Sequence, residues 1–180
     1  MMVKESDPVN ALKQRLPDAR FLSTAPGRVN LLGEHVDYNG GAVLPAAIDR
    51  TVKIAARERN DELITLLAMD LDAAVELRIP DLEKKIDKAG QPLPHWALYP
   101  AGVAWSLQKN DFPITGIDAV YTSDVPIGSG LSSSAAVEVA FAALWQAIGD
   151  WPLDKLSLAK YCLEAENTYV GLNCGLMDQF

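Results

Sequence analysis

Cysteine and histidine are scarce in this chain of 180 residues, which has two of each. Cys162 and Cys174 provide neither a disulfide framework nor a cluster of metal ligands, and the two histidines add no ligand spacing typical of a metal centre. No apolar run approaches the length of a membrane span, and the first eight residues lack the apolar core of a signal peptide. We therefore expect a cytoplasmic protein that does not bind membranes.

Basic residues are also in short supply. Sixteen lysines and arginines stand against 24 aspartates and glutamates, a formal net charge of -8, which argues against a nucleic-acid partner because such partners need a basic surface. An acidic protein that binds an anion has to concentrate positive potential locally, at helix N-termini, at a few arginines or at a metal ion. Hydrophobic residues make up 49% of the chain, enough for the core of one domain.

Hydrophobic patterning predicts short strands followed by helices. Strands are expected at residues 21–25, 42–44, 48–56, 63–68, 74–79 and 116–123, and helices at 10–16, 95–108, from a small-residue loop to about 149, and at 152–169. Several short strands in succession favour an antiparallel or mixed sheet. The aromatic residues of the helix at 95–108 are interpreted as core rather than as a cofactor site. No repeat or linker divides the chain.

The small-residue loop has the sequence Pro-Ile-Gly-Ser-Gly-Leu-Ser-Ser-Ser-Ala-Ala at 126–136 and leads into an alanine-rich helical segment. Gly128 and Gly130 permit backbone angles closed to other residues, and the first turn of the helix offers unpaired N–H groups and the positive end of its dipole. Together these features form a seat for phosphate. A Walker loop and a dinucleotide fingerprint are excluded by spacing. Taken alone, the loop is equally well interpreted as a turn in which Ser132 caps a core helix.

A second informative stretch, residues 25–41, crowds polar side chains between glycines. It carries Arg28, Glu34, His35, Asp37 and Asn39. Carboxylates and an amide at this spacing could bind the vicinal hydroxyls of a sugar, and Arg28 could face a phosphate or steady a carboxylate. Metal ligation through His35 competes with this interpretation, although no second ligand cluster supports it. A solvated loop without a role is the remaining alternative.

Three segments, in order along the chain, resemble motifs of one enzyme family. Residues 27–39, Gly-Arg-Val-Asn-Leu-Leu-Gly-Glu-His-Val-Asp-Tyr-Asn, are similar to the galactokinase signature. Residues 126–136 resemble the phosphate-binding motif of the GHMP kinases, the superfamily of galactokinase, homoserine, mevalonate and phosphomevalonate kinases. Residues 174–180, Cys-Gly-Leu-Met-Asp-Gln-Phe, resemble the galactokinase segment that holds the catalytic aspartate. The first motif is the most specific, because relatives with other substrates share the phosphate loop.

The resemblance implies an α+β fold, the N-terminal GHMP-kinase domain, in which a mixed β-sheet has helices packed on one side in a ribosomal-protein-like two-layer arrangement. Residues 1–180 would form this single domain. The C-terminal GHMP-kinase domain would be absent from this chain, because galactokinases are much longer. We expect apolar surface that the second half would cover, so a C-terminal half on another chain, or self-association, would bury it.

The resemblance also implies ATP-dependent phosphorylation of the anomeric hydroxyl of α-D-galactose, with Mg²⁺ as the cofactor. The product, galactose 1-phosphate, is the form in which galactose enters the Leloir pathway. Matching positions assign Asp178 as the catalytic carboxylate and Arg28 as its charge partner. The remaining assignments are Glu34, His35, Asp37 and Gly175 for the sugar, Gly128, Ser129, Gly130, Leu131, Ser132, Ser133 and Ser134 for the triphosphate, and Ser134 and Glu166 for Mg²⁺. Asp178 would either accept the sugar proton or orient the hydroxyl while the proton leaves late.

Two alternatives stay open. A galactose- and ATP-binding sensor without turnover, or a truncated regulatory fragment, would share these motifs. The intact run Ser133-Ser134-Ala135-Ala136 favours kinase ancestry, because non-catalytic relatives are disrupted there. Within the enzyme class, N-acetylgalactosamine is an alternative sugar. The chain alone would have one wall of each site, so its activity in isolation is a separate question.

Overall fold

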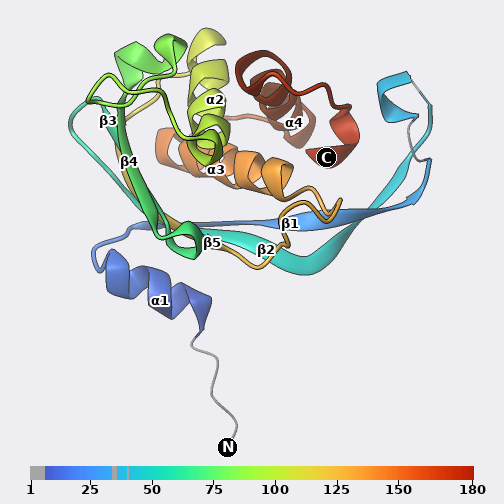
Figure 1. Ribbon diagram of the computed structural model, residues 1–180, viewed down its shortest axis with the longest axis horizontal. Coiled ribbons are helices and arrows are strands. Elements are labelled where there is room, and N and C mark those ends of the chain that lie inside the picture. The colour runs from blue at the N-terminus through green and yellow to red at the C-terminus, as the bar shows by residue number, and fades with distance from the viewer. Residues whose placement is uncertain (1–6, 34–35, 40) are drawn as a thin grey trace, which may run out of the picture.

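The computed structural model describes residues 7–33, 36–39 and 41–180. Five strands form one mixed sheet in the order β1-β2-β5-β3-β4 (Figure 1). Their bounds are β1 (Phe21–Leu32), β2 (Leu44–Glu58), β3 (Leu63–Ala68), β4 (Ala73–Arg78) and β5 (Ile117–Ser123). Neighbours run antiparallel except β3 and β5, which are parallel. That parallel pair requires a long crossover, and the crossover carries a helix.

Three helices cover one face of the sheet and a fourth lies on the other (Figure 1). The covering helices are α2 (His95–Lys109), α3 (Ser133–Gly149) and α4 (Lys155–Glu164). Because side chains alternate along a strand, Val52 and Ile54 of β2 join the main core beneath these helices, whereas Ala55 packs against α1 (Pro8–Arg15) on the opposite face. The expected α+β fold with a mixed sheet is confirmed, and the structure adds α1 on the second face.

The hairpin of β1 and β2 is longer than the sequence predicts. The strand expected at 21–25 continues to Leu32, and the two strands expected at 42–44 and 48–56 are one, β2. Irregularities of register between Pro26 and Arg28 and between Asn30 and Leu32 let this glycine-containing polar sequence stay paired. The first part of β2, which contains Pro45, is paired with β1 alone. A proline is tolerated there because this part of the strand has a free edge.

The helix expected at 152–169 is two segments. Asp154 caps α4, accepting a hydrogen bond from the Ser157 N–H at 3.0 Å, and the chain then widens into a π-helix, η4 (Ala165–Val170). Tyr169 anchors this π-helix, because its hydroxyl donates to the Leu82 carbonyl at 2.7 Å and its own carbonyl accepts from Lys85 Nζ at 2.6 Å. A π-helical turn inside a helix often marks a functional site, and this one carries Glu166.

The other expected elements match to within a few residues, including β3, β5, α2 and α3. Short 3-10 turns occur at η1 (Asp37–Asn39), η2 (Met69–Leu71), η3 (Ile79–Lys84) and η5 (Leu176–Asp178). Among the helices described, none has both the length and the apolar character needed to cross a membrane.

Candidate active site

Arg28 of β1 and Asp178 of η5 form an ion pair between segments 150 positions apart in the sequence. Arg28 Nε donates to Asp178 Oδ1 at 3.1 Å, and Arg28 Nη2 donates to the same oxygen. The remaining nitrogen of the guanidinium, Nη1, donates to the Gly130 carbonyl of the small-residue loop at 2.6 Å. One side chain therefore joins all three segments that carry the family motifs.

The backbone also joins β1 to the small-residue loop. The Arg28 N–H donates to the Leu131 carbonyl at 3.1 Å. Gly27 makes this approach feasible, because a Cβ built there would lie 2.7 Å from the Leu131 oxygen. The pair formed by Arg28 and Asp178 is therefore held directly beside the start of α3.

The loop has the backbone geometry that its glycines predict. Gly128 and Gly130 have φ of +73° and +75°, angles that other residues adopt only with strain. Ser132 precedes α3 with φ of +54°, and its side chain does not cap the helix; its buried Oγ has no hydrogen-bond partner. The structure thus argues against the interpretation of Ser132 as an ordinary side-chain cap. The first N–H groups of α3 lack acceptors within the helix, as in any helix.

A cavity of about 700 Å³ lies beside the ion pair, within the range typical of small-molecule sites. Its wall comes from β1, from the first part of β2, from α3, from the start of α4 and from the C-terminal segment. The polar side chains in this wall are Arg28, Asp178 and Gln179, and most other lining residues are apolar, among them Val43, Leu44, Pro45, Ala135, Val139, Leu156, Met177 and Phe180. A mainly apolar pocket with a few charged groups suits a small polar ligand held in one orientation.

The residues expected to hold a sugar are only partly described. Glu34 and His35 lie outside the described residues. Asp37 belongs to η1, which lies against η5, the turn that carries Asp178. Gly175 is buried and immediately precedes η5 in an extended conformation. The structure thus brings the elements of Asp37, Gly175 and Asp178 together.

Glu166 and Ser134, the two positions expected to serve Mg²⁺, come from η4 and from the first turn of α3. The Glu166 carboxylate is buried, and its Oε2 accepts hydrogen bonds from Gln179 Nε2 at 2.6 Å and from Cys174 Sγ at 3.1 Å. Carboxylate and hydroxyl oxygens are suitable donors for Mg²⁺, which usually takes its other ligands from phosphate and water. Among the described residues, no three or more His, Cys, Asp or Glu side chains gather as a metal cage.

Two buried polar residues beside this site were not identified from the sequence. Glu138 of α3 is 0% exposed and Gln179 is 5% exposed, and Gln179 Nε2 donates to Glu138 Oε2 at 3.3 Å. Burial, followed by the nearby charge of Glu166, raises the pKa of the Glu138 carboxyl well above its ordinary value. The sequence did contain a signal, because Glu138 is the one charged residue in the apolar stretch 135–145.

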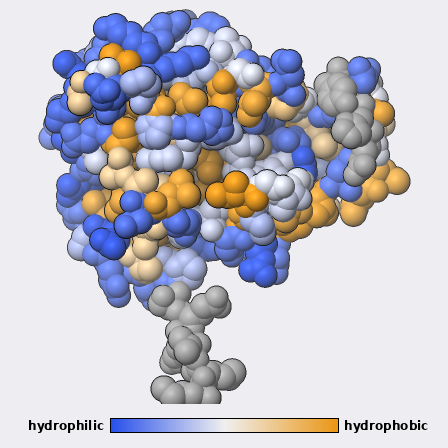
Figure 2. Space-filling view, viewed as in Figure 1, coloured by the Kyte–Doolittle hydropathy of each residue, from blue (hydrophilic) through white to orange (hydrophobic). Residues whose placement is uncertain are grey.

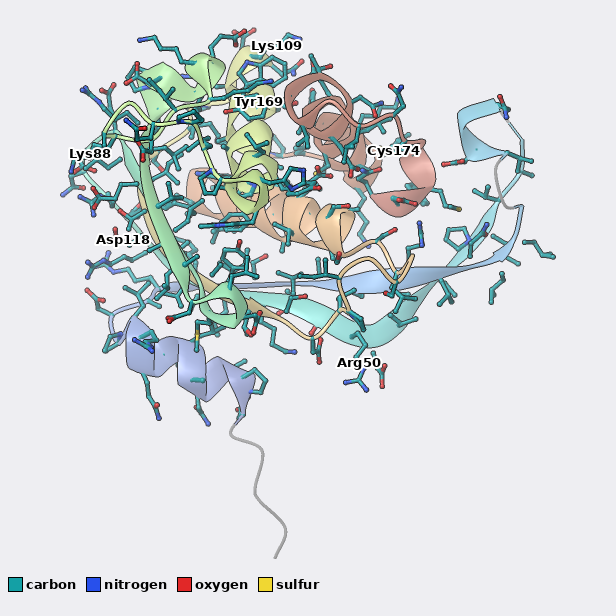
Figure 3. The ribbon with its side chains drawn as sticks, viewed as in Figure 1. Arg50, Lys88, Lys109, Asp118, Tyr169 and Cys174 are labelled. Carbon is teal, nitrogen blue, oxygen red and sulfur yellow. The ribbon has the colours of Figure 1, made fainter. Side chains whose placement is uncertain are left out.

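Cys174 belongs to the same cluster, next to the C-terminal turn (Figure 3). Burial and the hydrogen bond to Glu166 raise the pKa of its thiol, so the thiol stays protonated. Its backbone N–H donates to Asn167 Oδ1 at 3.0 Å. Cys174 thereby fastens the start of the C-terminal segment to the π-helix that carries Glu166.

Two family models match this chain. The galactokinase galactose-binding signature matches residues 11–58, and the N-terminal domain of GHMP kinases matches residues 99–180. A galactokinase from Streptomyces coelicolor is 45% identical over 156 residues, 86% of this chain, and one from Chloroflexus aurantiacus is 42% identical over 158 residues, 88% of this chain. In both cases the chain spans 39% of the relative's length.

Solved structures agree with these matches. The crystal structure of Lactococcus lactis galactokinase complexed with galactose has a TM-score of 0.83 and 29% identity, covering 95% of this chain and 44% of that one. A mevalonate kinase with a TM-score of 0.70 and 22% identity, covering 88% of this chain and 50% of that one, shares the fold. The fold and the small-residue loop beside the paired arginine and aspartate define a GHMP kinase N-terminal domain, so this chain belongs to the GHMP kinase family. Within that family it belongs with the galactokinases, and it matches their N-terminal part.

Proposed function

We propose that this chain carries the catalytic wall of an ATP-dependent galactose kinase, which transfers the γ-phosphoryl group of ATP to the anomeric hydroxyl of galactose. The observation that carries the proposal is the position of Arg28, which binds Asp178 and the Gly130 carbonyl at once. A carboxylate for the sugar hydroxyl and a loop for the phosphates thus lie on either side of one cation, as phosphoryl transfer requires.

Asp178 would act on the sugar. In the transfer, the anomeric oxygen forms a bond to the γ-phosphorus, the bond from that phosphorus to the bridging oxygen of ADP breaks, and the hydroxyl proton is released. The carboxylate either accepts that proton or orients the hydroxyl while the proton leaves late. Asp37 and Gly175, on elements beside Asp178, together with Glu34 and His35, would hold the other hydroxyls.

The loop at 128–134 would hold the triphosphate through its backbone. Gly128 and Gly130 shape the loop, and the N–H groups of the first turn of α3 donate to phosphate oxygens. Ser132 Oγ, buried and without a partner, is a further donor within this loop. Because the chain has a net charge of -8, these local donors and Arg28 supply the positive potential that an anionic ligand needs.

Mg²⁺ would be held by Glu166 and Ser134 together with phosphate oxygens and water. When bound, it neutralises charge on the phosphates. The partners of the chain are then galactose and MgATP. The remaining length of the relatives would supply the opposite wall of the cavity, either from a second segment or from an associated chain.

The test is a coupled assay of ADP release with galactose and MgATP, accompanied by calorimetry of galactose binding. Three samples are compared: the chain alone, its Asp178→Asn variant, and the chain mixed with the part of the Streptomyces coelicolor galactokinase that it does not match. We expect galactose-dependent turnover in the mixture. Asp178→Asn should remove most of that turnover and weaken galactose binding only modestly, because the amide keeps the shape of the carboxylate but not its charge.

Each result has a distinct meaning. Turnover that survives in Asp178→Asn would exclude the aspartate as the base. Galactose and ATP binding without ADP release in any sample would instead assign a sensor. N-acetylgalactosamine as a second substrate in the same assay tests the alternative sugar.

A further inference from the structure

The turn that carries Asp178 is fastened at both of its ends. At its start, the Cys174 backbone N–H donates to Asn167 Oδ1 at 3.0 Å, and Asn167 Nδ2 donates to the Cys174 carbonyl at 3.4 Å. At its end, the residue after Asp178 is Gln179, whose side chain points inward and is 5% exposed. The first fastening ties the turn to the π-helix alone, whereas the second reaches two elements.

Gln179 joins those elements through one nitrogen. Its Nε2 donates to Glu166 Oε2 of η4 at 2.6 Å and to Glu138 Oε2 of α3 at 3.3 Å. The amide has two hydrogens on this nitrogen, enough for both carboxyl groups, and Cys174 Sγ lies 3.8 Å from the same nitrogen. The opposite orientation would set the amide oxygen against the Glu166 carboxylate, the nearer of the two groups, so this contact decides how the amide lies.

We propose that Gln179 and Glu138 are positioning residues, which fix Asp178 relative to the start of α3 and to Glu166. We call the side chains of Gln179, Glu138 and Glu166 the Gln179 clamp. The inference rests on the proposed function, since it concerns the geometry in which that reaction would take place. Glu138 is four residues beyond Ser134 on the same helix, so the clamp ties Asp178 to the helix that begins at the phosphate loop.

The purpose of such a clamp follows from the position of Asp178. The carboxylate has to stay in reach of the sugar hydroxyl while the phosphate loop holds the other reactant, and displacement of about 1 Å is enough to cost roughly 100-fold in rate. At the end of the short turn η5, the Gln179 N–H donates to the Leu176 carbonyl at 3.3 Å. The side chain of Gln179 adds connections to η4 and α3 beside the pair that Asp178 itself makes with Arg28.

The test uses four variants of the full chain. Gln179→Met removes the amide at nearly constant size, Glu138→Met removes one acceptor, and Glu138→Gln keeps an acceptor oxygen. Gln146→Met is the matched control, because the Gln146 amide also makes two hydrogen bonds, to the Trp151 and Leu153 carbonyls, at the far end of α3. The first measurement is hydrogen exchange of the backbone amides of residues 176–180, and the second is turnover and galactose affinity in the assay above.

We expect faster exchange at 176–180 in Gln179→Met and Glu138→Met, with turnover about 100-fold lower and galactose affinity little changed. Glu138→Gln should retain slow exchange and turnover, and Gln146→Met should lose stability without either effect. Unchanged exchange in Gln179→Met, or equal damage from Glu138→Gln and Glu138→Met, would overturn the clamp. If the unaltered chain shows no turnover in any mixture, the proposed function fails, and the exchange measurement alone decides the clamp.

Discussion

Arg28 illustrates how much of the site depends on the shape of one side chain. Its guanidinium donates through Nε and Nη2 to Asp178 and through Nη1 to the Gly130 carbonyl. These donors lie in one plane and point in different directions, which a lysine ammonium on a flexible stem does not reproduce. The arrangement therefore requires the geometry of arginine as well as its charge.

Arg28→Lys should lower kcat/KM by about 10- to 100-fold, because a hydrogen bond to a charged group contributes about 1.5–3 kcal/mol. Steady-state kinetics with galactose and MgATP measure the loss. Arg50→Lys is the control, since Arg50 is exposed and its nearest carboxylate oxygens are 3.8 and 4.0 Å away. If Arg28→Lys kept full activity, charge alone would explain the role of Arg28.

At the scale of the element, the small-residue loop at 126–136 depends on backbone angles more than on side-chain space. A Cβ built at Gly130 meets no atom within 4 Å, yet its φ of +75° is unfavourable for alanine. Gly90 is in the same situation, with φ of +81° and open space, but it lies in the connection between β4 and α2. The two glycines thus separate the effect of strain from the effect of location.

Gly130→Ala and Gly90→Ala should each lower the free energy of unfolding by about 1 kcal/mol, as urea denaturation would show. Gly130→Ala should also weaken MgATP binding in calorimetry, because the loop has to change shape to relieve the strain. We expect unchanged MgATP affinity in Gly90→Ala. A loop that binds MgATP equally well in both variants would contradict the backbone role of Gly130.

The elements that sequence patterning predicted well are those defined by their own residues. β3 alternates between buried and partly exposed positions along its length, and α2 has a nearly continuous apolar surface. The full length of β1 could not be predicted, since its second half is paired only through irregular register with β2. The π-helix η4 was missed for a similar reason, because distant contacts of Tyr169 with Leu82 and Lys85 hold it.

The residues of the candidate site also fall into those that the sequence predicts and those that only the structure shows. Motif resemblance predicted Arg28 beside Asp178, and the structure places them in contact. The roles of these two residues stay predictions until activity is measured. Gln179 and Glu138 are 41 positions apart, and their hydrogen bond arises only from how the C-terminal turn packs on α3. Such a contact has no local pattern in the sequence.

In the molecule as a whole, a network of ion pairs around Asp118 lies at the end of the sheet remote from Cys174 (Figure 3). Asp118 of β5 accepts from Arg57 Nε at 2.8 Å and from Arg59 Nη1 at 2.6 Å, and Arg59 also binds Asp61. Burial acts to raise the pKa of Asp118, but the hydrogen bonds from the two arginines outweigh it, so the net shift is downward. The hydrogen bond from Arg59 lowers the pKa of Asp61 to about 2.

A carboxyl group whose pKa is lowered by folding stabilises the protein above its unfolded pKa, near 4 for aspartate, and loses that contribution as the pH falls through the folded value. We therefore expect the free energy of unfolding to fall between about pH 4 and pH 2. Asp118→Asn should cost about 1–3 kcal/mol at neutral pH and make this fall smaller. Chemical denaturation across the pH range measures both effects.

The exposed Asp49 provides the control for the pH experiment. Its side chain is 94% exposed and its distance to Arg50 is 3.8 Å, so Asp49→Asn should leave the acid profile as it was. A profile for Asp118→Asn that follows the unaltered chain down to pH 2 would place the source of acid sensitivity elsewhere in the molecule.

Exposed apolar side chains gather at the outer end of the long hairpin, where Leu31, Leu32 and Leu44 are each more than half exposed. Apolar surface is visible at that end of the molecule (Figure 2). Phe180, which lines the cavity, is also exposed. That further protein surface covers the cavity side of the sheet stays a prediction.

The position of α1 has a practical consequence for binding experiments. This helix packs through Leu12, with Leu16 just after its end, on the face of the sheet opposite to α3 (Figure 1), and Lys13 of the helix is exposed. A dye or a linker to a sensor surface attached there would leave the mouth of the cavity unobstructed. Immobilised through α1, the molecule would present its candidate active site to the flowing solution in a uniform orientation.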